Sequence, residues 1–236
     1  CNRHVLIDEC RELFGEIYEQ IPELPFCNIW TAMQLSSRLP KGALFHMGVS
    51  NTRRCWNMFQ LPESVESACN VGCCGIDGCV STLVGASLVN PDRLCYVVVG
   101  DLTFFYDLNS LGNHHIGTNL RVMLVNNGRG TEFRLGIHHC NVFGDDADKY
   151  MAAAGHFGNK SPLLVKHYAE DLGFHYLSAT TKEEFMTALS NFTNPQLSDH
   201  SMILEVFTDS KDESEALYLM SHIQSDAKGM VRSKLK

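Results

Sequence analysis

Oxygen-bearing side chains follow two short apolar runs in the middle of the chain. Asp101 comes just after the run at 95–99, and Asn127 comes just after the run at 120–125. Apolar residues recur at helical spacing over 102–113, so the stretch predicts a strand, a helix and a second strand. Such a unit makes the two strands parallel and adjacent.

This order predicts a site for a hard divalent cation. Ligands of an open parallel sheet bind at the carboxyl ends of its strands, and adjacent strands lie roughly 5 Å apart. The Asp101 carboxylate and the Asn127 amide oxygen should therefore converge, and such oxygen ligands suit Mg2+. The N-terminus of the predicted helix and the hydroxyl of Thr103 favour a phosphate group beside them. The residues alone also permit an ordinary strand-helix-strand unit whose polar turn residues only cap a helix, although they favour the cation site.

The same residues resemble the signature of thiamine-diphosphate enzymes, in which Gly-Asp is followed by Asn-Asn further along the chain. The resemblance implies that Asp101, Asn127 and the backbone carbonyl of Arg129 hold Mg2+ on the diphosphate of thiamine diphosphate. One position departs from the signature, because Leu102 stands where Gly is usual. The other residues of the two motifs are implied to contact the cofactor: Gly100, Leu102, Thr103, Gly130 and Thr131.

Three further stretches resemble the same family in the same order. Residues 45–54, 70–78 and 100–109 are similar to the C-terminal cofactor domain of the menaquinone-pathway succinyl-enolpyruvyl-hydroxycyclohexene-carboxylate synthases. The similarity covers roughly residues 28–220, and the wider group includes acetolactate synthases and pyruvate decarboxylases. Residues 50–57 and 125–133 are more similar to a relative associated with surface-polysaccharide biosynthesis.

The resemblance also gives roles to residues outside the central unit. It gives Ser50 a hydrogen bond to the cofactor, places Gly75 and Ile76 beneath it with Ile76 as an apolar wedge, and gives Arg54 a contact with the substrate carboxylate. A guanidinium suits a carboxylate because it can bind both oxygens. Val71 stands where the menaquinone enzyme has a second arginine, and losing that partner should cost a few kcal/mol for the menaquinone substrate. From the residues alone, the arginines of 53–54 could as well be solvated surface side chains.

The leading function is the cofactor-binding part of an enzyme that decarboxylates a 2-oxo acid and then transfers the acyl-anion equivalent or releases an aldehyde. The resemblance places the glutamate that activates the cofactor in a separate pyrimidine-binding domain, so no residue of this chain is expected to do so. That domain is expected upstream or on a partner chain, so this chain is expected to be a fragment or one subunit. The resemblance also implies assembly as a homodimer or homotetramer. Two alternatives remain: a subunit of a split 2-oxo acid decarboxylase or oxidoreductase, and a non-catalytic α/β scaffold module.

Composition excludes several other classes of protein. The net charge of −8 offers no basic surface for nucleic acid or anionic membranes. No apolar run approaches the roughly 18 residues that span a bilayer, and no signal peptide opens the chain. The ten cysteines include no Cys-x-x-Cys pair, so they predict reduced, mostly buried thiols of a cytoplasmic protein. His138, His139 and Cys140 are adjacent, so they are not expected to converge on one metal ion.

The hydrophobic pattern predicts a doubly wound α/β fold, in which a mostly parallel sheet of about six strands carries helices on both faces. It divides the chain into a linker helix over 1–27, the cofactor domain over 28–224 and a frayed polar tail over 225–236. Asn28 is the expected N-cap of the second helix. Residues 48–54 form a polar turn, 55–63 an irregular segment, and 133–160 an irregular flap beside the site. Strands are expected at 43–47, 66–70, 95–99, 120–125, 174–177 and 202–207, and helices at 1–25, 28–39, 79–89, 102–113, 162–172, 181–192 and 213–223.

Overall fold

One six-stranded sheet organises the chain, and all of its strands are parallel. The computed structural model describes residues 3–72, 74–136, 138–150 and 161–234. The strand order is β2-β1-β3-β4-β6-β5, which confirms the expected parallel sheet. The strands are β1 (Leu44–Met47), β2 (Glu66–Cys69), β3 (Cys95–Gly100), β4 (Leu120–Asn126), β5 (His175–Ala179) and β6 (Met202–Phe207).

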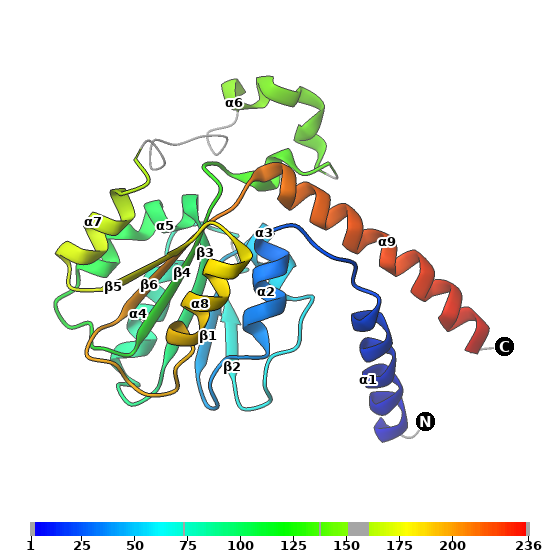
Figure 1. Cartoon of the computed structure of the whole chain (residues 1–236), viewed down its shortest axis with the longest axis horizontal. Helices are drawn as coiled ribbons and strands as arrows, with labels where there is room; N and C mark the ends of the chain where they lie inside the picture. The colour runs from blue at the N-terminus through cyan, green and yellow to red at the C-terminus, as the bar shows by residue number, and fades with distance from the viewer. Residues whose placement is uncertain (1–2, 73, 137, 151–160, 235–236) are drawn as a thin grey trace.

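Helices cover both faces of this sheet, as Figure 1 shows, and each face has its own apolar core. The first core joins the sheet to α2 (Asn28–Ser36), α3 (Asn51–Trp56), α8 (Lys182–Phe192) and the start of α9 (Ser210–Lys234). The second core joins it to α4 (Cys79–Leu88), α5 (Asp101–Asp107) and α7 (Leu164–Asp171). The fold is therefore the doubly wound arrangement that the sequence predicts.

The chain reverses its winding direction between β1 and β3. From β1 it passes through α3 to β2 on one side, and then through α4 on the opposite face to β3 on the other side. Gly48 lets the turn after β1 pass close to β3, because a Cβ there would lie 3.2 Å from the carbonyl oxygen of Val98 and 3.3 Å from the Cα of Val99. The crevice outside the carboxyl ends at such a reversal is where doubly wound sheets bind their ligands.

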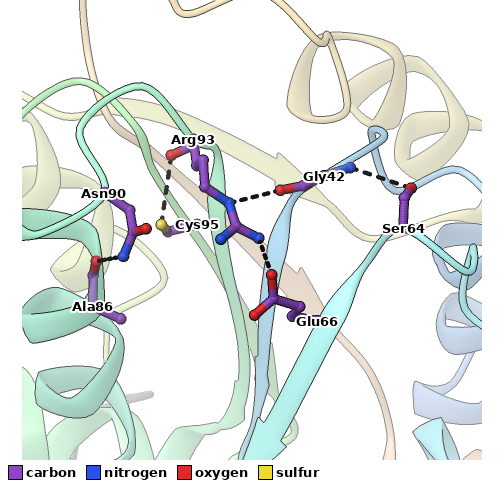
Figure 2. Close-up of polar contacts among 7 residues, drawn as sticks. All are labelled: Gly42, Ser64, Glu66, Ala86, Asn90, Arg93 and Cys95. Carbon is purple, nitrogen blue, oxygen red and sulfur yellow. Dashed lines mark hydrogen bonds and ion pairs between the residues drawn. The ribbon is translucent and has the colours of Figure 1, made fainter.

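Polar contacts tie the loops together at the opposite, amino-terminal edge of the sheet (Figure 2). Arg93 donates from Nε to the carbonyl oxygen of Gly42 at 2.9 Å and from Nη2 to Glu66 at 2.9 Å. The backbone N–H of Gly42 donates to Ser64 Oγ at 3.2 Å. These contacts hold the starts of β1, β2 and β3 in register. They lie at the edge of the sheet opposite the crevice where a ligand is expected.

Several element boundaries differ from the sequence expectations. Residues 51–56, expected to lie partly in a turn and partly in an irregular segment, form α3 because buried Cys55 and Trp56 pack against the first core. The helix expected over 102–113 is α5 followed by a 3-10 turn, η1 (Leu108–Gly112), at whose start Ser110 Oγ donates to the carbonyl of Asp107. The helix expected over 181–192 is α8, and Thr181 is its N-cap, since its side chain accepts a hydrogen bond from the N–H of Glu184.

The two terminal helices also depart from expectation. α1 (Arg3–Glu19) ends before Pro22, and α9 continues to Lys234 where a frayed tail was expected. The segment after residue 223 contains no proline, and an existing helix extends at little cost because its nucleus is already formed. α1 and α9 lie side by side at the edge of the molecule (Figure 1). No helix within the described ranges is long and apolar enough to cross a membrane.

The flap expected over 133–160 is described only in part. It begins with short helical turns, namely η2 (Thr131–Arg134), η3 (His139–Asp146) and α6 (Ala147–Tyr150). His138 Nδ1 accepts a hydrogen bond from the N–H of Cys140 at 3.1 Å, so this histidine is engaged within its own turn. The remainder of the expected flap, 151–160, lies outside the described residues.

Candidate functional site

A pocket of about 210 Å³ opens at the carboxyl ends of β1, β3 and β4. It therefore lies at the reversal point of the sheet, where a ligand is expected. The structure brings ten of the predicted cofactor residues into its wall and leaves Gly75 and Arg54 outside. Those in the wall are Ser50, Ile76, Gly100, Asp101, Leu102, Thr103, Asn127, Arg129, Gly130 and Thr131.

Asp101 supplies a buried carboxylate to this pocket. It is the first residue of α5, directly after β3, and only 2% of its surface is exposed. Its Oδ1 accepts a hydrogen bond from the N–H of Leu102 at 2.8 Å, and buried Thr103 lines the same wall. A buried carboxylate is costly unless hydrogen bonds or a cation compensate its charge, so this position suits a divalent cation.

The turn after β4 also lines the pocket, and its own hydrogen bonds fix its shape. Asn126 Oδ1 accepts from the N–H of Gly128 at 3.2 Å, and Asn127 Oδ1 accepts from the N–H of Arg129 at 3.4 Å. The carbonyl oxygen of Arg129 accepts from the N–H of Thr131 at 2.9 Å. Gly128 has a φ of +81°, which glycine adopts without steric cost. The turn therefore holds Asn127 and Arg129, which line the same pocket as Asp101, in a defined conformation.

Backbone strain is concentrated at the same pocket. In the described part of the chain, Ser50 (φ 59°) and Cys74 (φ 52°) are the two non-glycine residues with positive φ, and both line the pocket. Such conformations cost on the order of 1–3 kcal/mol each and persist where the surroundings enforce them, commonly at functional sites. This distribution independently favours this pocket as the candidate functional site.

The residues present fit a magnesium diphosphate group. Thr131 is only 4% exposed, and its Oγ1 has no hydrogen-bond partner among the described residues, although it lines the pocket. An unsatisfied buried hydroxyl is costly and calls for a ligand atom. The predicted cation ligands in this wall, Asp101, Asn127 and the backbone carbonyl of Arg129, offer one carboxylate, one amide oxygen and one carbonyl oxygen, which is a hard-cation donor set. The described residues hold no cluster of three His, Cys, Asp or Glu side chains that would suit a transition metal.

Arg54 lies beside the pocket and is already engaged. It forms an ion pair with Glu132, which lines the pocket. The Arg54 side chain is 45% exposed and that of Glu132 is 13% exposed. Glu132 Oε2 is buried and has no hydrogen-bond partner among the described residues. Val71, the position of the missing second arginine, is 43% exposed and does not line the pocket.

Sequence reasoning missed other lining residues, of which Asn28 is the most informative. Its expected role as N-cap of α2 is wrong, because Cys27 is the N-cap and its Sγ accepts from the N–H of Trp30. Asn28 instead accepts at Oδ1 from Trp56 Nε1 at 3.0 Å and donates its N–H to Glu213 at 3.0 Å. No local pattern reveals this position, because its partners lie far away in sequence. The other missed lining residues are Val49, Asn51, Thr52, Cys74, Val125, Glu132 and Phe133.

Two buried glutamates lie behind the pocket. Burial raises the pKa of Glu213 to about 7, although the hydrogen bonds from Asn28 and Thr208 oppose the shift. Burial also raises the pKa of Glu205, and hydrogen bonds from Asn126 and Tyr176 act in the opposite direction. Repulsion by the charge of Asp101 adds to the rise in pKa of both glutamates.

Comparison with known proteins shows which enzymes this chain is related to. No family model matches it. The 2-succinyl-5-enolpyruvyl-6-hydroxy-3-cyclohexene-1-carboxylate synthase of Bacteroides fragilis is 34% identical over 196 residues, which cover 83% of this chain and 34% of that enzyme. The enzymes of the same name from Phocaeicola vulgatus and Christiangramia forsetii are 34% and 33% identical, over 84% of this chain and 34% and 33% of their own lengths.

The chain is homologous to part of these synthases. It spans about a third of the length of the curated relatives it matches. The similarity therefore supports a relationship with this enzyme over most of the present chain. The activity, substrates and assembly of the whole enzyme belong to the proposal that follows.

Proposed function

We propose that this chain is the diphosphate-binding domain of a thiamine-diphosphate enzyme that decarboxylates a 2-oxo acid. The acyl-anion equivalent that results would be transferred to an acceptor or released as an aldehyde. One observation carries the proposal: Asp101, Asn127 and the turn from Arg129 to Thr131 surround one pocket at the reversal point of the sheet. The relationship to part of an enzyme of this class supports it.

Each lining residue has a role in this proposal. The Asp101 carboxylate, Asn127 Oδ1 and the carbonyl oxygen of Arg129 would hold Mg2+, since they supply hard oxygen ligands. The hydroxyl of Thr131, unsatisfied in the described structure, would donate to the diphosphate, as would those of Ser50 and Thr103. Ile76 offers an apolar surface for the body of the cofactor. Bound thiamine diphosphate would supply the electron sink for decarboxylation.

The remaining parts of the enzyme would come from outside this chain. The proposal includes a pyrimidine-binding domain, upstream or on a partner chain, which carries the activating glutamate, and assembly as a homodimer or homotetramer. Arg54 would meet the substrate carboxylate, and it must then exchange or share its ion pair with Glu132. With Val71 in place of a second arginine, the enzyme would carry out a reaction other than that of the menaquinone pathway.

Thermal unfolding with and without cofactor tests this function. With Mg2+ present and thiamine diphosphate at about a hundredfold its Kd, ligand binding adds roughly 2.7 kcal/mol, which raises the Tm of a chain of this size by about 5–10 °C. Asp101→Asn should abolish the rise, and so should removal of Mg2+ with a chelator. Asp199→Asn makes the same chemical change at the amino-terminal edge of the sheet and should keep the full rise. A parent chain without an Mg2+-dependent shift, or an equal shift in Asp101→Asn, would contradict the proposal.

A further inference from the structure

A carboxylate outside the pocket wall holds the turn after β4 in its conformation. We propose that Glu205 is a positioning residue for residues 126–131, the turn that presents Asn127 and Arg129 to the cation. The inference rests on the proposed function for the identity of the ligand. The hydrogen bonds of Glu205 and Asn126 support the positioning role independently of that identity.

Glu205 is an unusual residue for its place in the fold. It lies in the otherwise apolar strand β6, between β4 and the edge strand β5, and it is 1% exposed. Its Oε1 accepts from Asn126 Nδ2 at 2.7 Å, and its Oε2 accepts from the hydroxyl of Tyr176 at 2.7 Å. Both carboxylate oxygens are therefore engaged, and the three residues link the neighbouring strands β4, β6 and β5.

This contact fixes which way the amide of Asn126 points. Because Nδ2 faces Glu205, Oδ1 faces the other way and accepts from the N–H of Gly128 at 3.2 Å. A reversed amide would place its NH2 group against the N–H of Gly128, donor against donor. The orientation of Asn126 therefore decides whether the backbone of the turn is held. Asn127 and Arg129, the proposed cation ligands, are the neighbours of Gly128 on either side.

Stability alone does not account for this glutamate. A buried charge carries a large desolvation cost, and a well-packed apolar residue in its place is often neutral or stabilising. An apolar side chain cannot accept from Asn126, so it would leave the amide free to turn. Partners that orient metal ligands in this manner typically change metal affinity ten- to a hundredfold when removed. Glu205 thus contributes orientation of the turn more than folding energy.

The first test compares two substitutions of Glu205. Glu205→Met keeps the length of the side chain but cannot accept a hydrogen bond, so Mg2+ affinity in the presence of thiamine diphosphate should fall roughly ten- to a hundredfold. Glu205→Gln can accept from Asn126 with its Oε1 and donate to Tyr176 with its Nε2, so its affinity should stay within about threefold of the parent. Isothermal titration with Mg2+ measures both. An unchanged affinity in Glu205→Met, or an equal loss in Glu205→Gln, would overturn the inference.

A second pair of variants tests the positioning role of Glu205 if Glu205→Met fails to fold. Tyr176→Phe removes the hydroxyl that donates to Glu205. Tyr96→Phe is the control, because it removes a tyrosine hydroxyl that donates to the carbonyl of Phe192 in the first core. Mg2+ affinity should fall several-fold in Tyr176→Phe and remain unchanged in Tyr96→Phe. Equal affinities in the two variants would count against a positioning role.

Hydrogen exchange of the ligand-free chain separates this inference from the proposed function. Peptides covering 126–131 should exchange faster in Glu205→Met and Tyr176→Phe than in the parent, while Tyr96→Phe leaves them unchanged. Unaltered exchange in all variants overturns the role of Glu205. If the variants exchange faster but the parent shows no Mg2+-dependent stabilisation, the positioning role of Glu205 stands and the proposed cation site is refuted.

Discussion

Ser50 is a residue of the pocket wall whose strained backbone lowers the stability of the fold. Its φ of 59° and ψ of −124° lie in a region that is essentially reserved for glycine. Its carbonyl oxygen accepts from the N–H of Arg54, so the strained residue also begins α3. A serine kept in such a conformation is best explained by a use for its hydroxyl group at the pocket.

Two substitutions of Ser50 should separate strain from binding. Ser50→Gly relieves the strain and should raise the free energy of unfolding by about 1 kcal/mol, after allowance for the greater backbone entropy of glycine. Ser50→Ala keeps the strain, so its stability should equal that of the parent. Both lose the hydroxyl and should bind thiamine diphosphate several-fold more weakly. Urea unfolding and titration measure the two effects, and a Ser50→Gly variant less stable than the parent would argue against stored strain.

At this scale, the sequence allows two residues to be paired where the motif is local, and both line the pocket. Asp101 and Asn127 could be paired in advance because each directly follows a strand of one βαβ unit. Glu205 was missed, although one signal was present: a charged residue inside an otherwise apolar strand must find partners when buried. Asn28 could not have been placed, because its partners Trp56 and Glu213 come from α3 and α9.

The junction of α2 and α9 depends on one buried glutamate. Glu213, in the first turn of α9, accepts at Oε1 from the N–H of Asn28 and from the hydroxyl of Thr208. Its Oε2 is buried and has no hydrogen-bond partner among the described residues. Neighbouring Cys27 stays a neutral thiol, because burial and then the charge of Glu213 raise its pKa to about 12. A proton on Glu213 therefore relieves an uncompensated charge at this junction.

Stability should accordingly depend on pH through Glu213. Its pKa of about 7 in the folded state exceeds its value in the unfolded chain, so the folded state binds more protons between these values. The stabilisation is full below the unfolded pKa and is lost as the pH rises through about 7. The loss should be on the order of 2 kcal/mol between about pH 5.5 and pH 8. Urea unfolding at several pH values measures it.

A matched pair of variants assigns that pH dependence. Glu213→Gln carries no charge and should be as stable as the parent at low pH and more stable at high pH, so most of the slope disappears. Glu215→Gln makes the same change at an exposed position of the same helix and should keep the slope of the parent. A parent slope retained in Glu213→Gln would place the titrating group elsewhere.

Element boundaries were harder to predict than element types, for physical reasons. All six strands were expected, and the central strands β3 and β4 were the clearest because each contains a continuous apolar run. α3 was missed, because a single helical turn is defined by the packing of Cys55 and Trp56 and not by its own periodicity. The end of α9 was misplaced, because a polar composition is compatible with a helix as well as with a tail.

For the whole molecule, the strand order brings together, in one pocket, motifs that are separate in the sequence. The sequence predicts parallel strands but not their order, which arises from contacts between distant segments. The observed order places the turn after β1 beside those after β3 and β4, which brings Ser50 to Asp101 and Asn127. Three motifs that are far apart along the chain thereby form one pocket, at the edge where the winding reverses.

The same pocket should bind the cofactor without completing its chemistry. Among the described lining residues the carboxylates are Asp101, the proposed cation ligand, and Glu132, which is paired with Arg54. Neither is free to act as the activating acid, so the purified chain should bind thiamine diphosphate with Mg2+ and release no CO2 from pyruvate or 2-oxoglutarate above the rate without protein. Binding by titration and CO2 release, measured on the same sample, check both halves. Steady turnover by the chain alone would show that activation arises within it, and would remove the reason for expecting a separate pyrimidine-binding domain.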